Sequence, residues 1–153
     1  MTPSAITSFR GEYAFLSNFA PCFAFAGGTL ETSYQAAKFT CSPDIMAQIV
    51  DAPTPGKAKR LAARWPHLVR PDWQRVRTQV MWCLLCEKFD PVFEPKMTAL
   101  LQTTNDALLI EGNQWHDTYW GVCFRNTCGG HGKNILGLLL MERRDQINGC
   151  INS

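Results

Sequence analysis

Proline residues divide the middle of the chain into short stretches, and each stretch has the apolar spacing of a helix. Ser42-Pro43-Asp44 places a capping hydroxyl, a proline and an acid at a helix start. Thr54-Pro55-Gly56 repeats this signal, while Pro53 and Pro66 mark the ends of the first and the second helix. Apolar residues recur three and four positions apart inside both stretches. This punctuation predicts a fold that is mainly helical.

Further helices are expected over residues 31–41, 73–89, 93–102 and 134–145, and the one over 73–89 is expected to be the longest. Their expected core positions include Val76, Val80, Cys83, Leu84, Phe93, Met97, Leu100 and Leu101. Residues 23–30 suggest a short strand and turn, and residues 107–111 and 118–124 suggest two more strands. A chain of 153 residues fits one domain. We therefore predict an α+β, mostly helical fold in a single compact domain over residues 1–153.

Charge and hydropathy exclude two broad classes of function. The net charge is +2 and charged residues make up 18% of the chain, so binding of duplex nucleic acid by bulk charge is not expected. The longest apolar stretch, Ile135–Met141, falls far short of the roughly 20 residues that a membrane-spanning helix needs. Residues 1–10 lack the basic flank and apolar run of a signal peptide. We expect a cytoplasmic protein with reduced thiols.

The seven cysteines fit no disulfide framework, because their number is odd and their spacing is irregular. Cys83 and Cys86 have the spacing of a redox motif, but they lie inside a helical pattern, so we expect them to be buried and structural. Cys123 and Cys128, near His116 and His131, were weighed as a zinc site. Their spacings match no common structural zinc pattern and a second short-spaced ligand pair is missing. We therefore expect no metal.

Two segments in the first forty residues carry polar groups that folding alone does not require. Ser17 and Asn18 lie between aromatic residues, which suits a nucleoside, although a turn that closes a hydrophobic cluster explains them equally well. Glu31, Gln35 and Lys38 fall at positions i, i+4 and i+7, so one helix face carries a carboxylate, an amide and an amine. Such a face either contacts a ligand or is solvated.

Two later segments offer aromatic and charged side chains. Trp73 follows a basic set that would suit phosphates, or else it is a core anchor beside an exposed basic face. The basic residues are Lys57, Lys59, Arg60, Arg64 and Arg70. The segment from Trp115 to Trp120 contains His116 and Asp117 and would build a base pocket with an acid inside it. The glycine-rich residues 129–134 precede a helix that Asn134 is expected to cap, and they are a weak anion-binding signal.

The succession of these segments resembles the NADAR (YbiA-like) family from about Ile6 to Arg144. The matching pieces, in order, are Phe-Arg-Gly-Glu-Tyr-x-Phe-Leu-Ser-Asn-Phe, Glu-x-x-Tyr-Gln-Ala-Ala-Lys, Ala-Lys-Arg-Leu, Arg-x-Asp-Trp-x-x-Val-x-x-x-Val-Met, Lys-Phe, Leu-Leu, Ile-Glu, Asp-x-x-Trp-Gly, Gly-x-Asn-x-Leu-Gly and Leu-Met. This chain departs from the family pattern at Thr32, where the family often has His, and at Ala62-Ala63, where it usually has Gly-Arg. The family's Trp-Gly-x-Gly becomes Trp120-Gly121-Val122-Cys123.

The resemblance implies an N-glycosidase that needs no cofactor and no metal. Its expected substrates are ADP-ribosyl-guanine or a phosphoribosylamino-pyrimidine of riboflavin synthesis, in which ribose C1 is bonded to an exocyclic amine. Glu31 would act as general acid and base, and Lys38 would form a Schiff base with the opened sugar. Asp117 would orient the ribose hydroxyls or stabilise positive charge at C1.

The resemblance also implies a set of substrate-binding residues. These are Arg10, Ser17, Asn18, Phe19, Gln35, Trp73, Trp120, Gly121 and Asn134. A toxin partner of the ADP-ribosyltransferase type would fit the de-ADP-ribosylation activity, whereas the sequence does not indicate an oligomeric state.

Two other classes of function were weighed against the enzyme. A catalytically silent module that binds ADP-ribose or a related nucleotide would have less need of Glu31, Lys38 and Asp117 together. A helical nucleic-acid-binding domain is disfavoured by the near-neutral charge.

Overall fold

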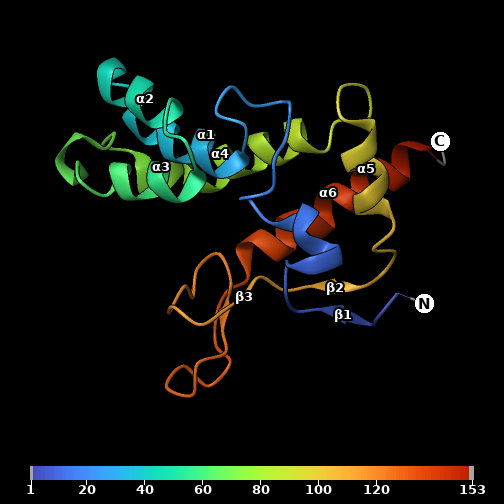
Figure 1. The fold of residues 1–153 in the computed structure, drawn as a ribbon. Coiled ribbons are helices and arrows are strands. Elements are labelled where there is room, and N and C mark those ends of the chain that lie inside the picture. The colour runs from blue at the N-terminus through green and yellow to red at the C-terminus, as the bar shows by residue number, and fades with distance from the viewer. Residues whose placement is uncertain (1, 152–153) are drawn as a thin grey trace. The chain divides into compact units, whose positions relative to one another are not determined.

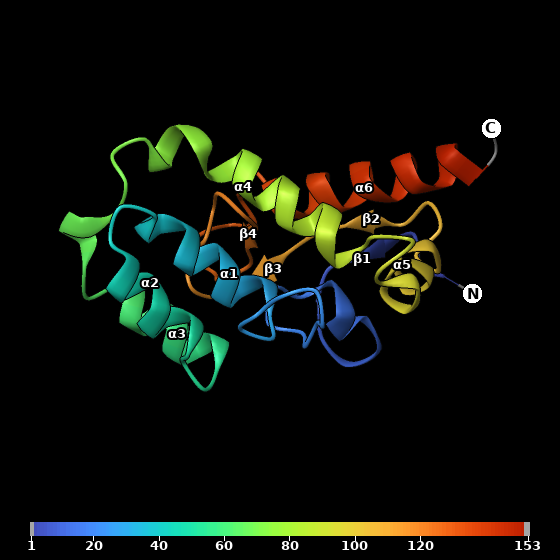
Figure 2. The ribbon, with the colours of Figure 1, turned by 90° about the horizontal axis from the view of Figure 1, so that it is seen from above.

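The computed structural model describes residues 2–151, and the side chains of residues 2–149. Cys150, the last of the cysteines, therefore lies outside the described side chains. The chain divides into two units: Asn18–Lys88 forms one, and the described residues on either side of that segment form the other. Figure 1 labels α1 to α6 and β1 to β3, and Figure 2 also labels β4.

The unit Asn18–Lys88 is entirely helical in its regular structure. Its elements are α1 (Leu30–Ala36), η2 (Ala37–Phe39), α2 (Pro43–Val50), α3 (Pro55–Ala62), η3 (Pro66–Leu68) and α4 (Trp73–Lys88), where η denotes a short 3-10 helix. Helix α1 contacts α2, α3 and α4, which makes it the central helix of this unit (Figure 2). The helices expected around residues 31–41, 43–52 and 55–65 are confirmed.

The helix starts in this unit follow the proline signals, with one difference in the capping. The hydroxyl of Thr54 accepts a hydrogen bond from the backbone N–H of Lys57 at 3.2 Å, as a capping residue does. Thr29 accepts in the same way from the N–H of Thr32 and so caps α1. Ser42 precedes α2 but makes no side-chain capping bond, so its predicted capping role is wrong. Pro43 starts α2 without that cap because its fixed φ suits the first helical position.

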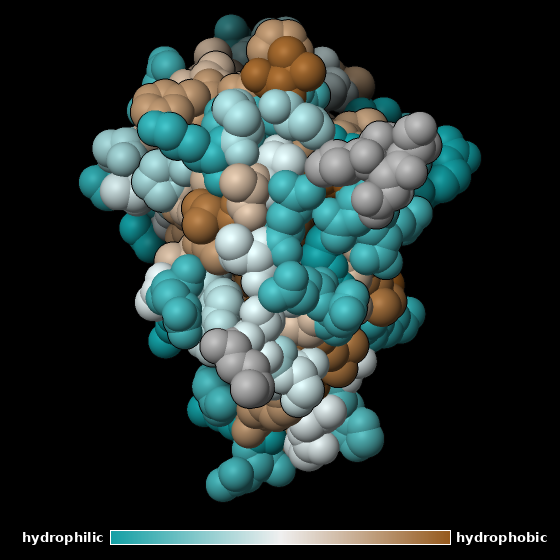
Figure 3. Space-filling view, turned by 90° about the vertical axis from the view of Figure 1, so that its right-hand side faces the viewer, coloured by the Kyte–Doolittle hydropathy of each residue, from teal (hydrophilic) through white to brown (hydrophobic). Residues whose placement is uncertain are grey.

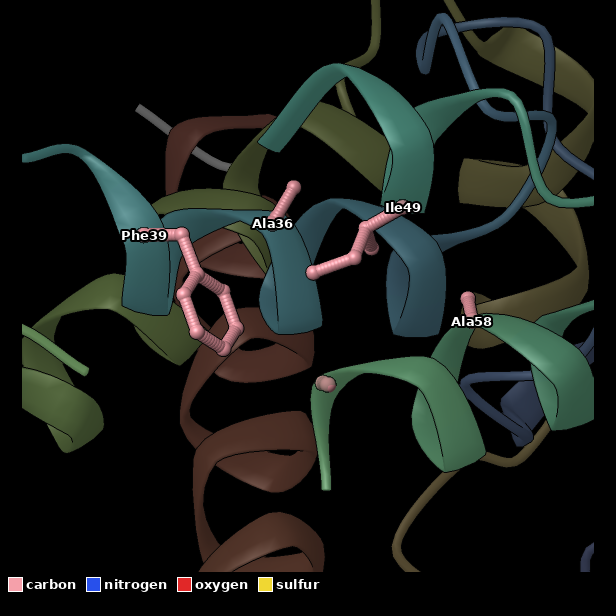
Figure 4. Packing of buried hydrophobic residues seen from close by; sticks show 5 residues of the cluster. Ala36, Phe39, Ile49 and Ala58 are labelled. Carbon is pink, nitrogen blue, oxygen red and sulfur yellow. The ribbon is translucent and has the colours of Figure 1, made fainter. Parts of the chain in front are cut away.

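Small side chains hold the first three helices of this unit together. The buried cluster consists of Ala36, Phe39, Ile49, Ala58 and Ala62, four of which are labelled in Figure 4. Phe39 and Ile49 supply the bulk, and the alanines allow the helix backbones to approach closely. Ala62, one of the two positions that depart from the family's Gly-Arg, is only 4% exposed. Packing therefore explains the small residue at that position.

Helix α4 buries a different face from the one that the sequence predicts. The buried residues are Trp73, Met81, Leu85 and Lys88, whereas Cys83 is exposed and Val76 is half-buried. Apolar residues surround much of α4, so their period does not select one face. Trp73 does so, because its ring lies 5.0 Å from that of Tyr34 on α1 and sets the rotation of α4. The prediction that Cys83 is buried is wrong, and Val76, Val80 and Leu84, the other predicted core positions, are only half-buried.

The second unit contains the short strands and two longer helices. Its elements are β1 (Ala5–Ile6), η1 (Gly11–Leu16), α5 (Pro95–Gln102), β2 (Leu108–Leu109), β3 (Gly112–Asn113), β4 (Val122–Cys123) and α6 (Ile135–Ile151). Strands β1 and β2 pair in parallel, with Ile6 opposite Leu109, and β3 pairs in parallel with β4. Buried Arg144 of α6 donates to the hydroxyl of Thr104 and to the carbonyl of Ala107, and so fixes α6 to the segment before β2.

Two helices of this unit differ from their predicted extents. Helix α5 begins at Pro95, because the Asp90 carboxylate accepts hydrogen bonds from the N–H groups of Val92 and Phe93 and holds them in a turn. Phe93 is consequently 82% exposed, and Leu100 is 41% exposed, so their predicted burial is wrong. Helix α6 has 17 residues and α4 has 16, so the predicted longest helix is the second longest among the described residues.

The strand expected over residues 23–30 does not form. The N–H of Cys22 bonds to the carbonyl of Gly28, and the N–H of Gly28 bonds to the carbonyl of Phe25, which closes a series of turns. Gly28 has a φ of +77°, a value that favours glycine. Phe23 is fully exposed at the tip of this segment. The predicted α+β, mostly helical class is nevertheless confirmed, since every described strand has only two residues.

The surface shows hydrophobic side chains scattered among hydrophilic ones on the face drawn in Figure 3. Within the described part of the chain, no helix has both the length and the apolar character needed to cross a membrane.

Candidate active site on helix α1

The polar face of α1 is buried. Glu31 is 6% exposed and Gln35 is 3% exposed, so this face is not the solvated one that the sequence also allowed. The Nε2 group of Gln35 donates a hydrogen bond of 2.7 Å to the Glu31 carboxylate. Spacing of four residues on a helix makes this bond possible, and it holds the acid in one orientation. A buried carboxylate in a fixed position is a feature of general acid and base groups.

Two buried oxygen atoms near this acid have no hydrogen-bond partner. They are Oε1 of Gln35 and Oδ1 of Asn18. The N–H of Glu31 donates to the backbone carbonyl of Asn18 at 2.9 Å, which brings Asn18 to the start of α1. Leaving an acceptor buried and unpaired costs roughly 1–3 kcal/mol. Hydroxyl groups of a bound sugar would satisfy both oxygens, so the pair marks this face as a candidate binding site.

Lys38 completes the face one helical turn beyond Gln35. Burial lowers its pKa below the usual value, and the charges of Lys59 and Arg77 act in the same direction. The Glu31 carboxylate opposes them, but it does not reverse the shift. A lysine with a depressed pKa is more often the free amine, which is the form that attacks carbonyl and imine carbons.

Two aromatic rings lie against the Lys38 amine. Its Nζ is 5.6 Å from the centre of the Tyr34 ring and 5.7 Å from that of Trp73. Trp73 is among the site residues that the sequence predicts, whereas Tyr34, which is buried on α1, is not. The spacing of four residues between Tyr34 and Lys38 is the signal that would have placed them together.

The basic residues of the α3 region do not form one surface. Lys59 contributes to the lowered pKa of Lys38, as described above. Lys57, Arg60 and Arg64 instead line a separate cavity of about 560 Å³ together with residues that include Asp51. Arg70 forms an ion pair of 2.6 Å with Asp72, and this hydrogen bond holds the pKa of the Asp72 carboxyl below its usual value.

Asp117, in the other unit, organises its own loop. One oxygen of its carboxylate accepts hydrogen bonds from the N–H groups of Tyr119 and Trp120, at 3.1 and 2.9 Å. The side chain of Asn113 bonds to both the N–H and the carbonyl of Asp117. The loop after β3 is therefore held by side chains that replace the ladder of a regular strand.

Gly121 and Asn134 stabilise the backbone next to this loop. A Cβ atom on Gly121 would lie 2.1 Å from the carbonyl oxygen of Glu111, so only glycine fits there. The side chain of Asn134 donates to the carbonyl of Leu109 and accepts from the N–H of Glu111. The side chain of Asn134 therefore ties the start of α6 to the segment between β2 and β3 and does not cap α6, which corrects the predicted cap.

The other predicted binding residues are spread over both units. Arg10 is exposed at the start of η1, and Ser17 is half-buried at its end. Phe19, in the unit of α1, is 44% exposed. Trp120 is half-buried with its ring 4.9 Å from that of Tyr119. The substrate-binding roles of these residues, and those of Gly121 and Asn134, stay predictions.

Comparison with known proteins assigns the chain to a family. The model of the NADAR domain matches residues 8–148. The chain belongs to the NADAR family. This membership confirms the resemblance that the ordered motifs indicated, and the NADAR match extends over most of both units.

Two curated proteins are similar in sequence to this NADAR chain, and the chain covers very different shares of their lengths. It is 36% identical over 142 residues to the N-glycosidase YbiA of Escherichia coli, and the match covers 89% of this chain and 82% of that protein. It is 34% identical over 136 residues to the riboflavin biosynthesis protein PYRR, chloroplastic, of Zea mays, and the match covers 83% of this chain. The chain spans only 21% of the maize protein's length.

A solved structure supports the NADAR fold. The NMR structure of the E. coli protein YbiA superimposes with a TM-score of 0.78 at 31% sequence identity. The match covers 97% of this chain and 88% of that chain.

Proposed function

We propose that this chain is an N-glycosidase, a hydrolase that cleaves the bond between ribose C1 and an amine of a base. The observation that carries the proposal is the α1 face, where buried Glu31 on α1 and a lysine with a lowered pKa, Lys38 on the adjoining η2, lie on one side of the helical segment. Family membership and the name of the E. coli relative support the same reaction class. A pure ADP-ribose-binding module would gain nothing from a depressed lysine pKa, so the enzyme is favoured over that alternative.

The first step opens the sugar ring. In a glycosylamine, the lone pair of the exocyclic nitrogen forms a C1=N bond as the C1–O4 bond breaks. The released O4 then takes a proton. Glu31 in its protonated form is placed to give that proton, and its carboxylate later takes one from water. Gln35 keeps the acid oriented through the 2.7 Å bond.

The second step transfers C1 to the protein and then to water. The free amine of Lys38 adds to C1 and becomes an ammonium. The Glu31 carboxylate takes a proton from this ammonium and passes it to the exocyclic nitrogen, so the base leaves as its amine and a protonated Lys38–C1 imine remains. Water adds to this imine and Lys38 leaves. The sum is one N-glycosidic bond and one water consumed, with the free amine and the free sugar formed.

Two substrates fit this chemistry. Relatives named for riboflavin biosynthesis favour a phosphoribosylamino-pyrimidine. The resemblance to the NADAR family also implies ADP-ribosyl-guanine, with removal of ADP-ribose from the base. Trp73 and Tyr34 would bound the site beside Lys38, and the unpaired oxygens of Asn18 and Gln35 would accept from ribose hydroxyls. The predicted role of Asp117, the toxin partner, the cytoplasmic location and the single domain stay predictions.

Product analysis tests the function and selects the substrate. The protein is incubated separately with DNA that carries ADP-ribosylated guanosine and with the phosphoribosylamino-pyrimidine, and the products are identified by chromatography and mass spectrometry. We expect release of free ADP-ribose from the first substrate or of ribose phosphate from the second. Glu31→Gln, which keeps the size of the side chain, serves as the control and should lose turnover by about 10²–10⁴-fold.

Cleavage of neither substrate, together with saturable binding of ADP-ribose, would replace the enzyme with the binding-module alternative. Full turnover by a folded Glu31→Gln protein would instead remove Glu31 from the mechanism.

A further inference from the structure

Three potential metal ligands converge in the loop region between β3 and α6. They are His116, Cys123 and Cys128, and their ligand atoms all lie within 4.8 Å of one another. The Nδ1 atom of His116 is 2.8 Å from Sγ of Cys128. Cys123 is completely buried and His116 is exposed, so the group lies at the surface with one wall in the interior. The α1 face contains none of these residues.

The backbone around the two cysteines is closed into a tight loop. The N–H of Cys123 bonds to the carbonyl of His131, and the N–H of Gly130 bonds to the carbonyl of Cys123. The N–H of Cys128 bonds to the carbonyl of Arg125 at 2.8 Å. Gly129 and Gly130 have positive φ angles of +63° and +73°, which allow the chain to turn back there. These bonds hold both sulfur atoms on one side of the loop without any need for a disulfide.

His116 is brought to the sulfur atoms by an unusual backbone conformation. Its φ is +66°, in the left-handed region that few residues other than glycine adopt. The side-chain oxygen of Asn113 accepts hydrogen bonds from the N–H groups of Trp115 and Asp117, and so holds the backbone on either side of His116. A strained conformation that aims a histidine at two thiols indicates a functional constraint.

The expectation that no metal binds is revised here, because the loop brings a third ligand to the two cysteines that sequence spacing does not reveal. Four residues separate Cys123 from Cys128, within the short spacing that zinc sites use for one ligand pair. A second short-spaced pair is missing from the sequence, and the third ligand, His116, lies in the segment that precedes β4. Cys123 also stands where the family's Trp-Gly-x-Gly motif has its second glycine, so this chain departs from the family motif at one of the three ligands.

We propose that His116, Cys123 and Cys128 bind one Zn²⁺ ion, with water as the fourth ligand, and that this ion fixes the loop that carries Asp117. Tetrahedral zinc with bonds of about 2.3 Å to sulfur and 2.0 Å to nitrogen places neighbouring ligand atoms about 3.5–3.8 Å apart. The distance of 2.8 Å between His116 Nδ1 and Cys128 Sγ would open, and any distance near the upper limit of 4.8 Å would close, by about 1 Å in each case. The proposal does not depend on the proposed N-glycosidase activity, because none of the three ligands belongs to the α1 face.

Zinc binding sets the protonation of His116. Arg125 lies with Nη1 3.1 Å from Nε2 of His116, and a guanidinium only donates. An imidazole that binds metal through Nδ1 carries its proton on Nε2, so exposed Arg125 turns away when zinc binds. Loss of its positive charge should therefore leave zinc affinity unchanged or raise it in Arg125→Ala.

Metal analysis tests the site on the full chain, purified without a histidine tag. The protein is equilibrated with zinc at a stated concentration and then dialysed against metal-free buffer. Elemental analysis should give about one zinc per chain. Replacement of zinc by Co²⁺ should give the absorption bands of a tetrahedral ion with thiolate ligands. Cys128→Ser and His116→Ala should each weaken binding by more than about 100-fold, since even changes beyond the ligands cost 10–100-fold.

Matched controls use the same residue types away from the loop. His67→Ala and Cys83→Ser change exposed side chains in the other unit and should retain one zinc. Cys123 is buried, so a Cys123→Ser protein could lose zinc through misfolding. The test therefore rests on Cys128→Ser and His116→Ala, which change more accessible residues. Zinc no higher in the wild type than in His116→Ala, or a Cys123–Cys128 disulfide in protein purified without oxygen, would overturn the proposal.

Discussion

The α1 face and the loop after β3 both carry polar residues that the sequence predicts as site residues, but these residues have different roles in the two regions. On α1 and η2 the backbone groups are bonded within the helical segment or to Asn18 and Thr29, so the side chains of Glu31, Gln35 and Lys38 are free of that task. In the loop the side chains of Asn113 and Asp117 satisfy backbone groups directly. A polar side chain on a helix is therefore available for chemistry, whereas a polar side chain in an irregular loop is first needed for folding.

This difference separates stability from activity in the two regions. Changes on the α1 face should reduce turnover with little effect on unfolding. Changes at Asp117 should lower stability first and affect turnover through the disordered loop.

The largest effect is expected at Lys38. Lys38→Met keeps the length of the side chain and removes the amine that attacks C1. Turnover should fall by at least about 10²-fold in single-turnover assays, while the melting temperature stays equal or rises, because a partly buried cation is removed. Lys57→Met, on the neighbouring helix, is the control and should retain turnover. A folded Lys38→Met protein with wild-type turnover would show that the amine is dispensable.

Asp117 should show the opposite behaviour. Asp117→Ala leaves the N–H groups of Tyr119 and Trp120 without their acceptor and should lower the free energy of unfolding by about 1–2 kcal/mol. Asp117→Asn keeps a carbonyl oxygen in the same place and should recover most of that loss. Chemical denaturation of both variants beside Glu31→Gln measures the contrast. An Asp117→Ala protein as stable as Glu31→Gln would contradict the distinction between loop and helix.

A smaller effect is expected at Gln35. Gln35→Met removes the hydrogen bond to Glu31 and should reduce turnover by about 5–10-fold, which corresponds to about 1 kcal/mol. Gln48→Met, an exposed change on α2, provides the comparison. Steady-state kinetics should show the loss in kcat more than in KM, because the bond orients the acid and does not bind the base. An unchanged kcat would mean that Glu31 is oriented by other contacts.

The smallest effect concerns the pH dependence of turnover. Lys38 must be uncharged to attack, so the rate rises with pH as this group loses its proton. The charge of Lys59 lowers the pKa of Lys38, and Lys59→Gln should therefore shift the rising limb to higher pH. Lys57→Gln should leave the limb in place. A shift to lower pH in Lys59→Gln would show that the limb belongs to another group.

The sequence predicted the α1 face because helical spacing alone places Glu31, Gln35 and Lys38 on one side. It missed Tyr34, whose position is equally periodic but whose contact with Trp73 depends on how α4 packs. The contacts within the loops could not be predicted from the spacing of apolar residues. The dual bond of Asn134 and the convergence of His116 on two cysteines depend on chain closure between residues far apart or in unusual conformations.

The buried residues were predictable where prolines mark the helix starts and small apolar residues lie on one face. The prediction failed where apolar residues surround the helix. The start of α3 at Thr54 and Pro55 is a local signal. The buried face of α4 is selected by tertiary contacts of Trp73. Phe93 was misplaced because the Asp90 turn holds it before the helix, in a conformation that apolar spacing does not reveal.

Reductive trapping tests most directly whether the α1 face supplies the amine that attacks the sugar. The protein is mixed with excess substrate, quenched with borohydride and digested, and the peptides are analysed by mass spectrometry. The account predicts that the sugar is attached to Lys38 in the wild type and that no label appears on that peptide in Lys38→Arg. Turnover at the wild-type rate with no label, or with the label on another lysine, would contradict it.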